Sequence, residues 1–201
     1  MGKMNLLKAN YEGKVGKTVG AKWKNQSTLR TFTKPSNPNT EAQQTVRNGF
    51  KAINAFVALF ADQIRYKSAL NTAGMSVRNA IVKLNAEMVS GNSFTKANLV
   101  ISKGGLQKVA GEAATATDGK ITVTWTEPTA TNFTSEAKLI AVAVQEASGM
   151  VEVFEAAADA ETATGSLTFE AGTVDIYVYF LDKRGSNKIA SLSDYLSVTV
   201  A

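Results

Sequence analysis

Short segments rich in β-forming residues follow one another through the second half of the chain, and they constrain the fold more than any other feature. Apolar and polar residues alternate over Lys120–Thr126, with isoleucine, valine and tryptophan on one face. Lys138–Val144 is nearly continuous apolar sequence, as expected of a central strand, and Val174–Leu181 has the strongest β pattern. Four more segments complete the pattern, the first of them as a strand or a connector: 98–102, 150–156, 165–172 and 195–200.

About seven short strands in about 100 residues, with one tryptophan early among them, are typical of an immunoglobulin-like β-sandwich. The chain contains no cysteine, so no disulfide can join two sheets. With Trp125 on its second strand, the region 120–201 resembles a fibronectin type III domain. This resemblance concerns the fold and implies no function.

The residues between 14 and 33 predict a β-hairpin. Lys14–Lys24 is the first strand, Asn25–Ser27 the turn and Thr28–Thr33 the return strand. One face of the first strand is apolar and carries Val15, Val19, Ala21 and Trp23, with Lys17 as the exception. The other face carries Lys14, Gly16, Thr18, Gly20, Lys22 and Lys24. Two strands are marginally stable in water, so we expect the hairpin to pack on a helix or a neighbouring subunit.

Two helices are predicted after the hairpin. Thr40 is a suitable N-cap, and Gln43 completes a capping box. Apolar residues then recur at steps of three and four over about six turns, at Ala42, Val46, Phe50, Ile53, Val57, Phe60 and Ile64. A second helix is predicted over 69–88, with a stop at Gly91-Asn92.

The charge changes sign along the chain. Residues 1–110 hold 17 lysines and arginines against 4 acidic residues, a net charge of +13, whereas residues 111–201 hold 5 against 13, a net charge of −8. We predict an α+β protein with a basic hairpin-plus-helices module at 1–101, a boundary at 102–119 and the β-sandwich at 120–201. Such asymmetry indicates partners of opposite charge, either nucleic acid or other copies of the chain.

Several residues near the N-terminus form one pattern: Gly13-Lys14-Val15-Gly16, Val19-Gly20, Trp23-Lys24, the run 37–44 (NPNTEAQQ), Arg47 and Phe50. The pattern resembles the start of an uncharacterised protein family of Bacteroidota and their phages. Members of that family share a basic front end, a helical middle and a C-terminal β domain. The resemblance implies a structural, virion-associated protein and carries over no activity.

The triplet Gly16-Lys17-Thr18 matches the end of a phosphate-binding loop. That motif requires a glycine at position 11, where Tyr11 stands, and it opens into a helix. The residues after Thr18 alternate as a strand does. We therefore expect no nucleotide here, and instead a strand whose glycines let another backbone or an aromatic ring approach closely.

Seven residues are candidates for binding a partner: Lys14, Lys17, Lys22, Trp23, Lys24, Arg30 and Arg47. Cations interleaved with aromatic rings suit nucleic acid, because they neutralise phosphates and stack on bases. The alternation places Trp23 on the apolar face, however. This favours a solvated basic face over a dedicated nucleic-acid site, and such a face can also meet acidic protein.

Catalytic chemistry has little support in the sequence. The chain has no histidine and no cysteine, which excludes Ser-His-Asp and Cys-His nucleophiles and histidine-bound zinc. The carboxylates Glu152, Glu155, Asp159, Glu161 and Asp175 are assigned to solvated faces and loops, without the spacing of a calcium loop. We expect no catalytic residue, no cofactor and no metal.

The leading hypothesis is a non-enzymatic structural protein, a phage head, neck or tail component that self-associates or binds other virion proteins. No segment is long and apolar enough for a signal peptide or a membrane span, so we expect the protein in the virion, or in the cytoplasm before assembly, without a membrane partner. Two alternatives stay open: a nucleic-acid-binding or packaging protein that uses the basic half, and a surface adhesin or glycan-binding module.

Overall fold

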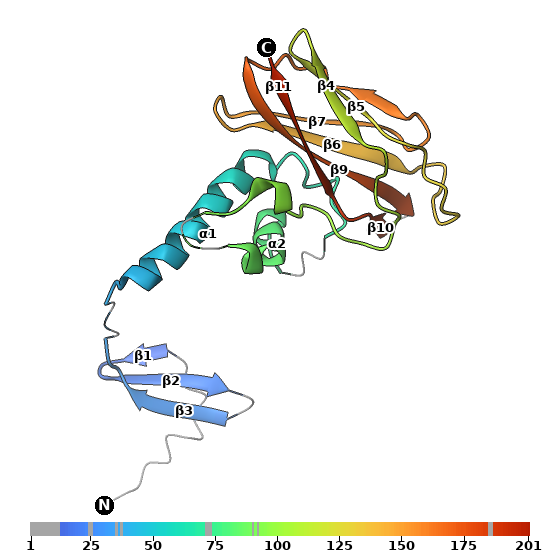
Figure 1. Cartoon of the computed structure of the whole chain (residues 1–201). Helices are drawn as coiled ribbons and strands as arrows, with labels where there is room; N and C mark the ends of the chain where they lie inside the picture. The colour runs from blue at the N-terminus through green and yellow to red at the C-terminus, as the bar shows by residue number, and fades with distance from the viewer. Residues whose placement is uncertain are drawn as a thin grey trace, which may run out of the picture. The chain divides into compact units, whose positions relative to one another are not determined.

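The structure is a computed structural model of the chain, shown in Figure 1. It describes residues 13–23, 26–34, 36, 38–70, 74–89, 91, 93–184 and 187–201, with only the backbone at 22–23 and 26–27. The chain divides into two compact units, Met1–Thr40 and Glu41–Ala201.

The first unit is a three-stranded antiparallel sheet, not the predicted hairpin alone. Its strands lie in chain order: β1 (Gly13–Val15), β2 (Thr18–Trp23) and β3 (Gln26–Thr31). The predicted first strand is interrupted by a tight turn at Gly16 and Lys17. Gly16 has a φ of 57°, which glycine tolerates because it has no Cβ. A phosphate-binding loop would open into a helix at this point, whereas here the chain continues into β2.

The turn changes which side chains share a face. Val15 pairs with Thr18, and Lys14 pairs with Val19. Residues directly opposite each other in an antiparallel pair lie on the same face of the sheet. The prediction that Val15 and Val19 share one apolar face is therefore wrong, because it assumed a single uninterrupted strand.

The second unit contains two antiparallel sheets and a helical layer, so the α+β class is confirmed in this form. The larger sheet has β6 (Lys138–Gln145) and β9 (Gly172–Arg184) at its centre. Beside β6 lies β7 (Met150–Ala157), and along the other edge of β9 lie β10 (Asn187–Ala190) and β11 (Asp194–Val200). The smaller sheet has the order β4 (Ala113–Thr117), β5 (Lys120–Thr124) and β8 (Thr162–Thr164).

Three segments differ from the strand prediction. The segment 113–117 was assigned to the boundary but forms β4, which a tight turn at Asp118 and Gly119 joins to β5. The strand expected at 165–172 is absent, and β8 lies just before it. The third is β10, which was not anticipated, whereas residues 98–102 form a connector, one of the two predicted alternatives.

The helices are α1 (Glu41–Phe60), α2 (Val77–Leu84) and the 3-10 turns η2 (Ala86–Met88) and η3 (Lys96–Asn98). The start of α1 directly after Thr40 agrees with the prediction. The second helix is much shorter than the predicted range 69–88. Its N-cap is Ser76, whose Oγ accepts a hydrogen bond from Asn79 N at 3.2 Å.

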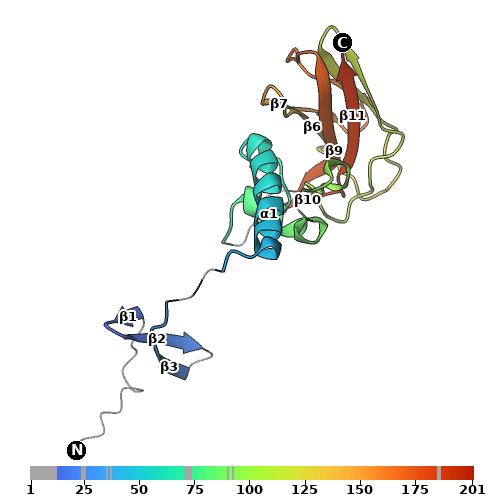
Figure 2. The ribbon, with the colours of Figure 1, turned by 60° about the vertical axis from the view of Figure 1, so that its left-hand side comes forward.

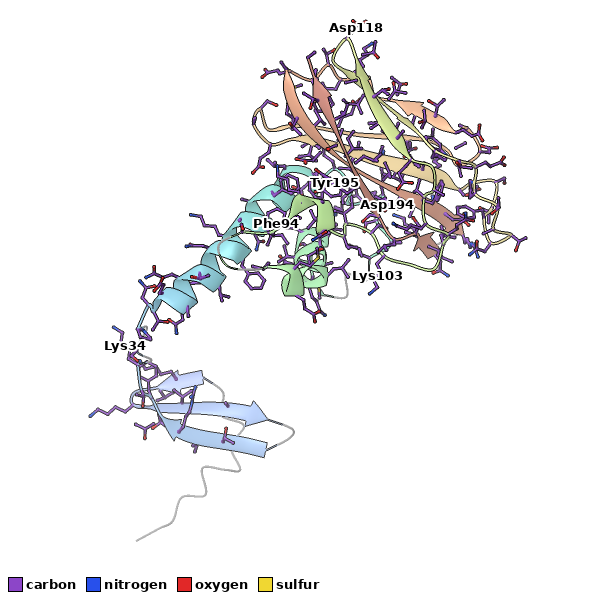
Figure 3. The ribbon with its side chains drawn as sticks, viewed as in Figure 1. Lys34, Phe94, Lys103, Asp118, Asp194 and Tyr195 are labelled. Atoms are coloured by element: carbon purple, nitrogen blue, oxygen red, sulfur yellow. The ribbon has the colours of Figure 1, made fainter. Side chains whose placement is uncertain are left out.

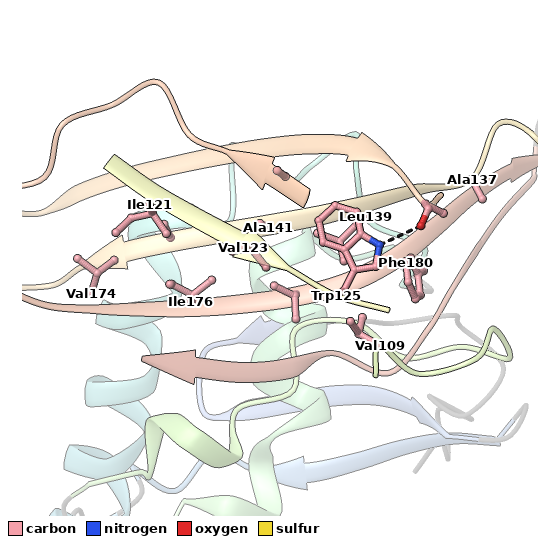
Figure 4. Packing of buried hydrophobic residues seen from close by; sticks show 14 of the residues in the cluster. Val109, Ile121, Val123, Trp125, Ala137, Leu139, Ala141, Val174, Ile176 and Phe180 are labelled. Atoms are coloured by element: carbon pink, nitrogen blue, oxygen red, sulfur yellow. Dashed lines mark hydrogen bonds between the residues drawn. The ribbon is translucent and has the colours of Figure 1, made fainter. Parts of the chain in front are cut away.

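The two sheets pack face to face around Trp125 (Figure 4). Apolar residues of the smaller sheet, such as Ile121 and Val123, meet Leu139 and other alternate residues of the larger one. The buried indole N–H of Trp125 donates a hydrogen bond of 2.9 Å to the Ala158 carbonyl. Both the bulk and the polar atom of the tryptophan are thus accommodated.

The helical layer covers the other face of the larger sheet, as the edge-on view of Figure 2 shows. Phe56 and Phe60 of α1 pack against the fully buried Tyr177, with ring centroids 6.3 and 6.2 Å apart from it. The predicted boundary at 102–119 would separate the helices from this sheet. The structure instead divides the chain at Thr40, because central strands that are apolar on both faces need a layer on each side.

Buried polar side chains tie the connector after η3 to both layers. Asn85, fully buried, donates from Nδ2 to the Val100 carbonyl at 2.7 Å and accepts from Val100 N at 2.8 Å. Further along, the Leu106 N–H donates to the Ala190 carbonyl of β10 at 3.1 Å. The backbone groups of Val100 and Leu106 thus form hydrogen bonds as they would in a strand, although the connector is not part of a sheet.

Gly104 lies where this connector passes β10, and it supplies a test of that contact. A Cβ at Gly104 would sit 2.2 Å from the Ala190 carbonyl oxygen, whereas a Cβ at Gly105 would meet no atom within 4 Å. We expect Gly104→Ala to lower the free energy of unfolding by roughly 1–3 kcal/mol, as overpacking does. Gly105→Ala is the matched control and should unfold at nearly the wild-type urea concentration. Equal denaturation midpoints for the two variants would contradict the close contact.

Candidate partner-binding surface

Two of the predicted partner-binding residues lie on one face of the first unit. Lys14 of β1 and Arg30 of β3 are each paired with Val19 of β2, so the three side chains form one row across the sheet. Adjacent strands lie about 4.8 Å apart, which places the two cationic residues on either side of a half-buried valine. Lys17 is exposed at the turn between β1 and β2.

The described residues of the first unit bury little of their apolar surface. Among its described residues only Gly20 is buried. Val15 is 64% exposed and Phe32 is 41% exposed. The Lys14 ammonium lies 3.7 Å from the centroid of the Phe32 ring, a cation–π contact at the surface. The sheet thus presents apolar and cationic groups side by side.

The first unit is also strongly basic. Residues 1–40 contain eight lysines and arginines and one acidic residue, Glu12, which gives a net charge of +7. Residues 41–201 contain 14 basic and 16 acidic residues, a net charge of −2. The positive charge of the chain is therefore concentrated in the unit with the least buried surface.

The other predicted site residues lie outside the row formed by Lys14, Val19 and Arg30. The backbone of Lys22 and Trp23 belongs to β2, but their side chains, and all of Lys24, lie outside the described residues. Arg47 is exposed on α1 and so belongs to the second unit. Its neighbour Val46 was predicted to lie on the buried apolar face of the helix, but it is 54% exposed. The first two turns of α1 are not covered by the described sheet or helices.

A buried polar cluster, which the sequence did not reveal, joins the helical layer to the larger sheet. Asp175 of β9 is 4% exposed and accepts hydrogen bonds from Lys96 Nζ at 2.9 Å and from the Tyr195 hydroxyl at 2.7 Å; Tyr195 is labelled in Figure 3. The Tyr177 hydroxyl donates to the Lys96 carbonyl at 3.0 Å. Burial alone would lower the pKa of Lys96, but hydrogen bonds to Glu146 and Asp175 outweigh it and raise the pKa. The assignment of Asp175 to a solvated face is wrong.

Glu152 and Glu155 serve as ties within the fold, whereas Asp159 and Glu161 are exposed, as predicted. Glu155 lies between Lys138 and Lys67, with N–O distances of 2.7 and 3.1 Å, and the Lys138 hydrogen bond is the main cause of its lowered pKa. One oxygen of Glu152 accepts from Ser166 N at 2.6 Å. Glu152 and Glu155 are three positions apart on β7 and so face opposite sides of the sheet, which prevents them from acting as a carboxylate pair.

The basic three-stranded sheet and the helix-covered β-sandwich define an α+β protein of two units. The chain belongs to the family of unknown function DUF6266, which matches residues 10–197 and so includes strands of both units. No curated protein matches the chain. In the described part of the chain, no helix has the length and apolar character to cross a membrane.

One solved structure that the chain matches is the crystal structure of the extracellular region of rat CD45, domains d3–d4. The sequences are 19% identical, and the TM-score is 0.37. The similarity covers 49% of this chain and 52% of that one, so the chain spans about half the length of the structure it matches.

Asp182 of β9 binds the loop that contains Thr134, and this contact can be tested by varying the pH. Its fully buried carboxylate accepts from Arg184 Nε at 2.9 Å and from the backbone and hydroxyl of Thr134. Burial alone would raise the pKa of Asp182, but the hydrogen bonds from Thr134 and Arg184 outweigh it and hold the pKa below its usual value of 3.8.

A folded-state pKa below the unfolded one stabilises the fold above about pH 3.8, and that stabilisation is lost as the pH falls through the lower, folded-state value. We expect urea denaturation between pH 5 and pH 2 to show a steeper loss of stability in the wild type than in Asp182→Asn. Identical pH profiles would show that Asp182 contributes no such linkage. Asp118→Asn, at an exposed turn, is the control for general charge effects.

Proposed function

We propose that this protein is a non-enzymatic assembly subunit, whose basic first unit docks on the acidic sandwich of a neighbouring copy. The observation that carries the proposal is the poor burial of the described residues of that unit. A sheet of three short strands, with Val15 and Phe32 exposed, covers its own apolar surface too little to be stable without a partner.

The charge distribution supports a copy of the same chain as the partner. The first unit carries +7, and residues 111–201, which form both sheets of the sandwich, carry −8. Surfaces of opposite sign attract over about a Debye length, which is about 10 Å at 0.1 M salt. A contact between different surfaces of identical chains repeats from copy to copy and builds a ring or a filament.

The resemblance of the first fifty residues favours a phage particle as the assembly. Within it, the chain would be a component of the head, neck or tail, with the sandwich contributing its immunoglobulin-like or fibronectin type III-like surface to contacts with neighbours. Arg47 and the exposed first turns of α1 follow the first unit directly in sequence, so they are included in the proposed interface.

The experiment compares the oligomeric state of the full chain and two double variants by size-exclusion chromatography with light scattering. Lys14→Glu with Arg30→Glu reverses both charges in the row across the first sheet. Lys103→Glu with Lys120→Glu makes the same charge change at exposed positions of the second unit. At low salt we expect the wild type and the control to self-associate and the Lys14/Arg30 variant to shift toward monomer.

High salt should shift the wild type in the same direction, because screening weakens exposed charge pairs. A wild-type chain that stays monomeric at high concentration in both salts would contradict the proposal. If the wild type is monomeric but binds duplex DNA with an affinity that Lys14→Glu with Arg30→Glu abolishes, the basic sheet belongs to a nucleic-acid-binding protein instead.

A further inference from the structure

Tyr66 is an exposed aromatic residue on a turn that the rest of the second unit holds in place. Its side chain is 75% exposed. Two residues earlier, Ile64 is fully buried, and the Lys67 N–H donates to its carbonyl at 2.9 Å. The hydroxyl of the buried Tyr179 donates to the Lys67 carbonyl at 2.7 Å. The turn is thus fixed on both sides of a ring that points into solvent.

Hollows flank the Tyr66 ring on two sides. One, of about 630 Å³, lies toward the start of α2 and is lined by Arg65 and Arg78. The other, of about 520 Å³, lies over the larger sheet and is lined by Lys183. Tyr66 and Lys188 line both hollows. They therefore form a continuous surface with the aromatic ring near its middle.

Contacts within the second unit hold cations near this ring. The guanidinium carbon of Arg65 is 5.5 Å from the Tyr66 ring centroid. The Lys188 ammonium donates a hydrogen bond to the Tyr66 carbonyl. Arg78 Nη2 donates to the Asn54 carbonyl at 3.0 Å, which holds that guanidinium at the edge of the first hollow. Positive charge is therefore present on both sides of Tyr66.

Lys183 and Lys188 face each other directly across β9 and β10. Like charges at directly opposite positions of an antiparallel pair are destabilising. Neither lysine forms an ion pair with any described residue, and the same is true of Arg65 and Arg78. Acidic residues also line the hollows, Asp62 in the first and Glu136 and Glu155 in the second, but cations outnumber them in each. A unit with a net charge of −2 thus gathers net positive charge around one exposed aromatic ring.

We propose that this surface binds single-stranded nucleic acid, with a base stacked on Tyr66 and the flanking phosphates over Arg65 and Arg78 on one side and Lys183 on the other, while Lys188 borders both hollows. An aromatic ring between cationic hollows is the combination that single-stranded nucleic acid requires, since every base has a face to stack and every linkage carries a charge. A single anion would occupy one hollow and leave the ring unused, whereas an extended strand uses both hollows and the ring.

This site lies wholly within the second unit, so it is independent of the docking proposed for the first. Binding of a short fluorescein-labelled oligothymidylate to the full chain is measured by fluorescence anisotropy at several salt concentrations. Every protein carries Lys14→Glu with Arg30→Glu, which reduces binding by the first unit. In that background we expect Tyr66→Ala to weaken binding roughly tenfold, from the loss of one stacked base, and Tyr66→Phe to retain it.

Lys183→Glu and Lys188→Glu should each reduce the steepness of the fall of log affinity with log salt by about 0.7, the value for one phosphate contact on a single strand. Lys120→Glu, at an exposed position on β5, is the matched control and should leave the slope nearly unchanged. Thermal unfolding followed by circular dichroism checks that each variant is folded.

Heparin, a polyanion without bases, separates stacking from charge. The proposal requires that Tyr66→Ala weaken oligothymidylate binding and leave heparin binding unchanged. Equal oligothymidylate affinities for Tyr66→Ala and Lys120→Glu would overturn it. A second result would also overturn it: heparin binds more tightly than oligothymidylate, and Tyr66→Ala weakens the binding of both polymers equally. The surface would then be a site for acidic polymers in general.

Discussion

The pairing of β6 with β9 is the interaction on which the second unit depends. These strands are neighbours over seven residue pairs, from Lys138–Leu181 to Val144–Asp175. Alternate residues of both strands point to opposite faces, and nearly all of them are apolar and buried. One face can be covered by the smaller sheet, but the other then needs a second layer. The helices supply it, so the helical segment is a structural part of the sandwich and not a separate module.

The described residues of the first unit show no comparable constraint. Its strands are three to six residues long, and the row formed by Lys14, Val19 and Arg30 has one apolar member between two cations. A sheet of this kind gains little from burial of its own side chains, and its cations repel one another. Contact with an acidic surface would relieve both problems together, because it covers the exposed Val15 or Phe32 and supplies the missing negative charge.

The sequence was sufficient where periodicity alone decides the structure. The strands β5, β6, β7, β9 and β11 and the start of α1 lie where the pattern predicts them. Tight turns were harder to predict. Asp118-Gly119 is a strong hairpin signal, but it lies inside the segment that was predicted to be a boundary. Gly16 lies in a turn that reverses the chain where alternation predicted one continuous strand. Contacts between residues far apart in the chain could not be predicted from the sequence pattern. Lys96 and Asp175 are 79 positions apart, so nothing in the local pattern shows that the aspartate is buried and paired.

The two basic surfaces differ in how rigidly they are held, and this difference affects how they can bind. Tyr66 and Arg65 lie on a turn fixed by Ile64 and by the Tyr179 hydroxyl, and the other three cations lie on α2, β9 and β10, so little backbone entropy is lost when a ligand binds there. A few contacts are then enough for measurable affinity and for discrimination between ligands. The first sheet has no buried anchor among its described side chains. Its binding must also supply the burial that the unit lacks, which favours a large complementary surface such as a neighbouring protein subunit over a small ligand.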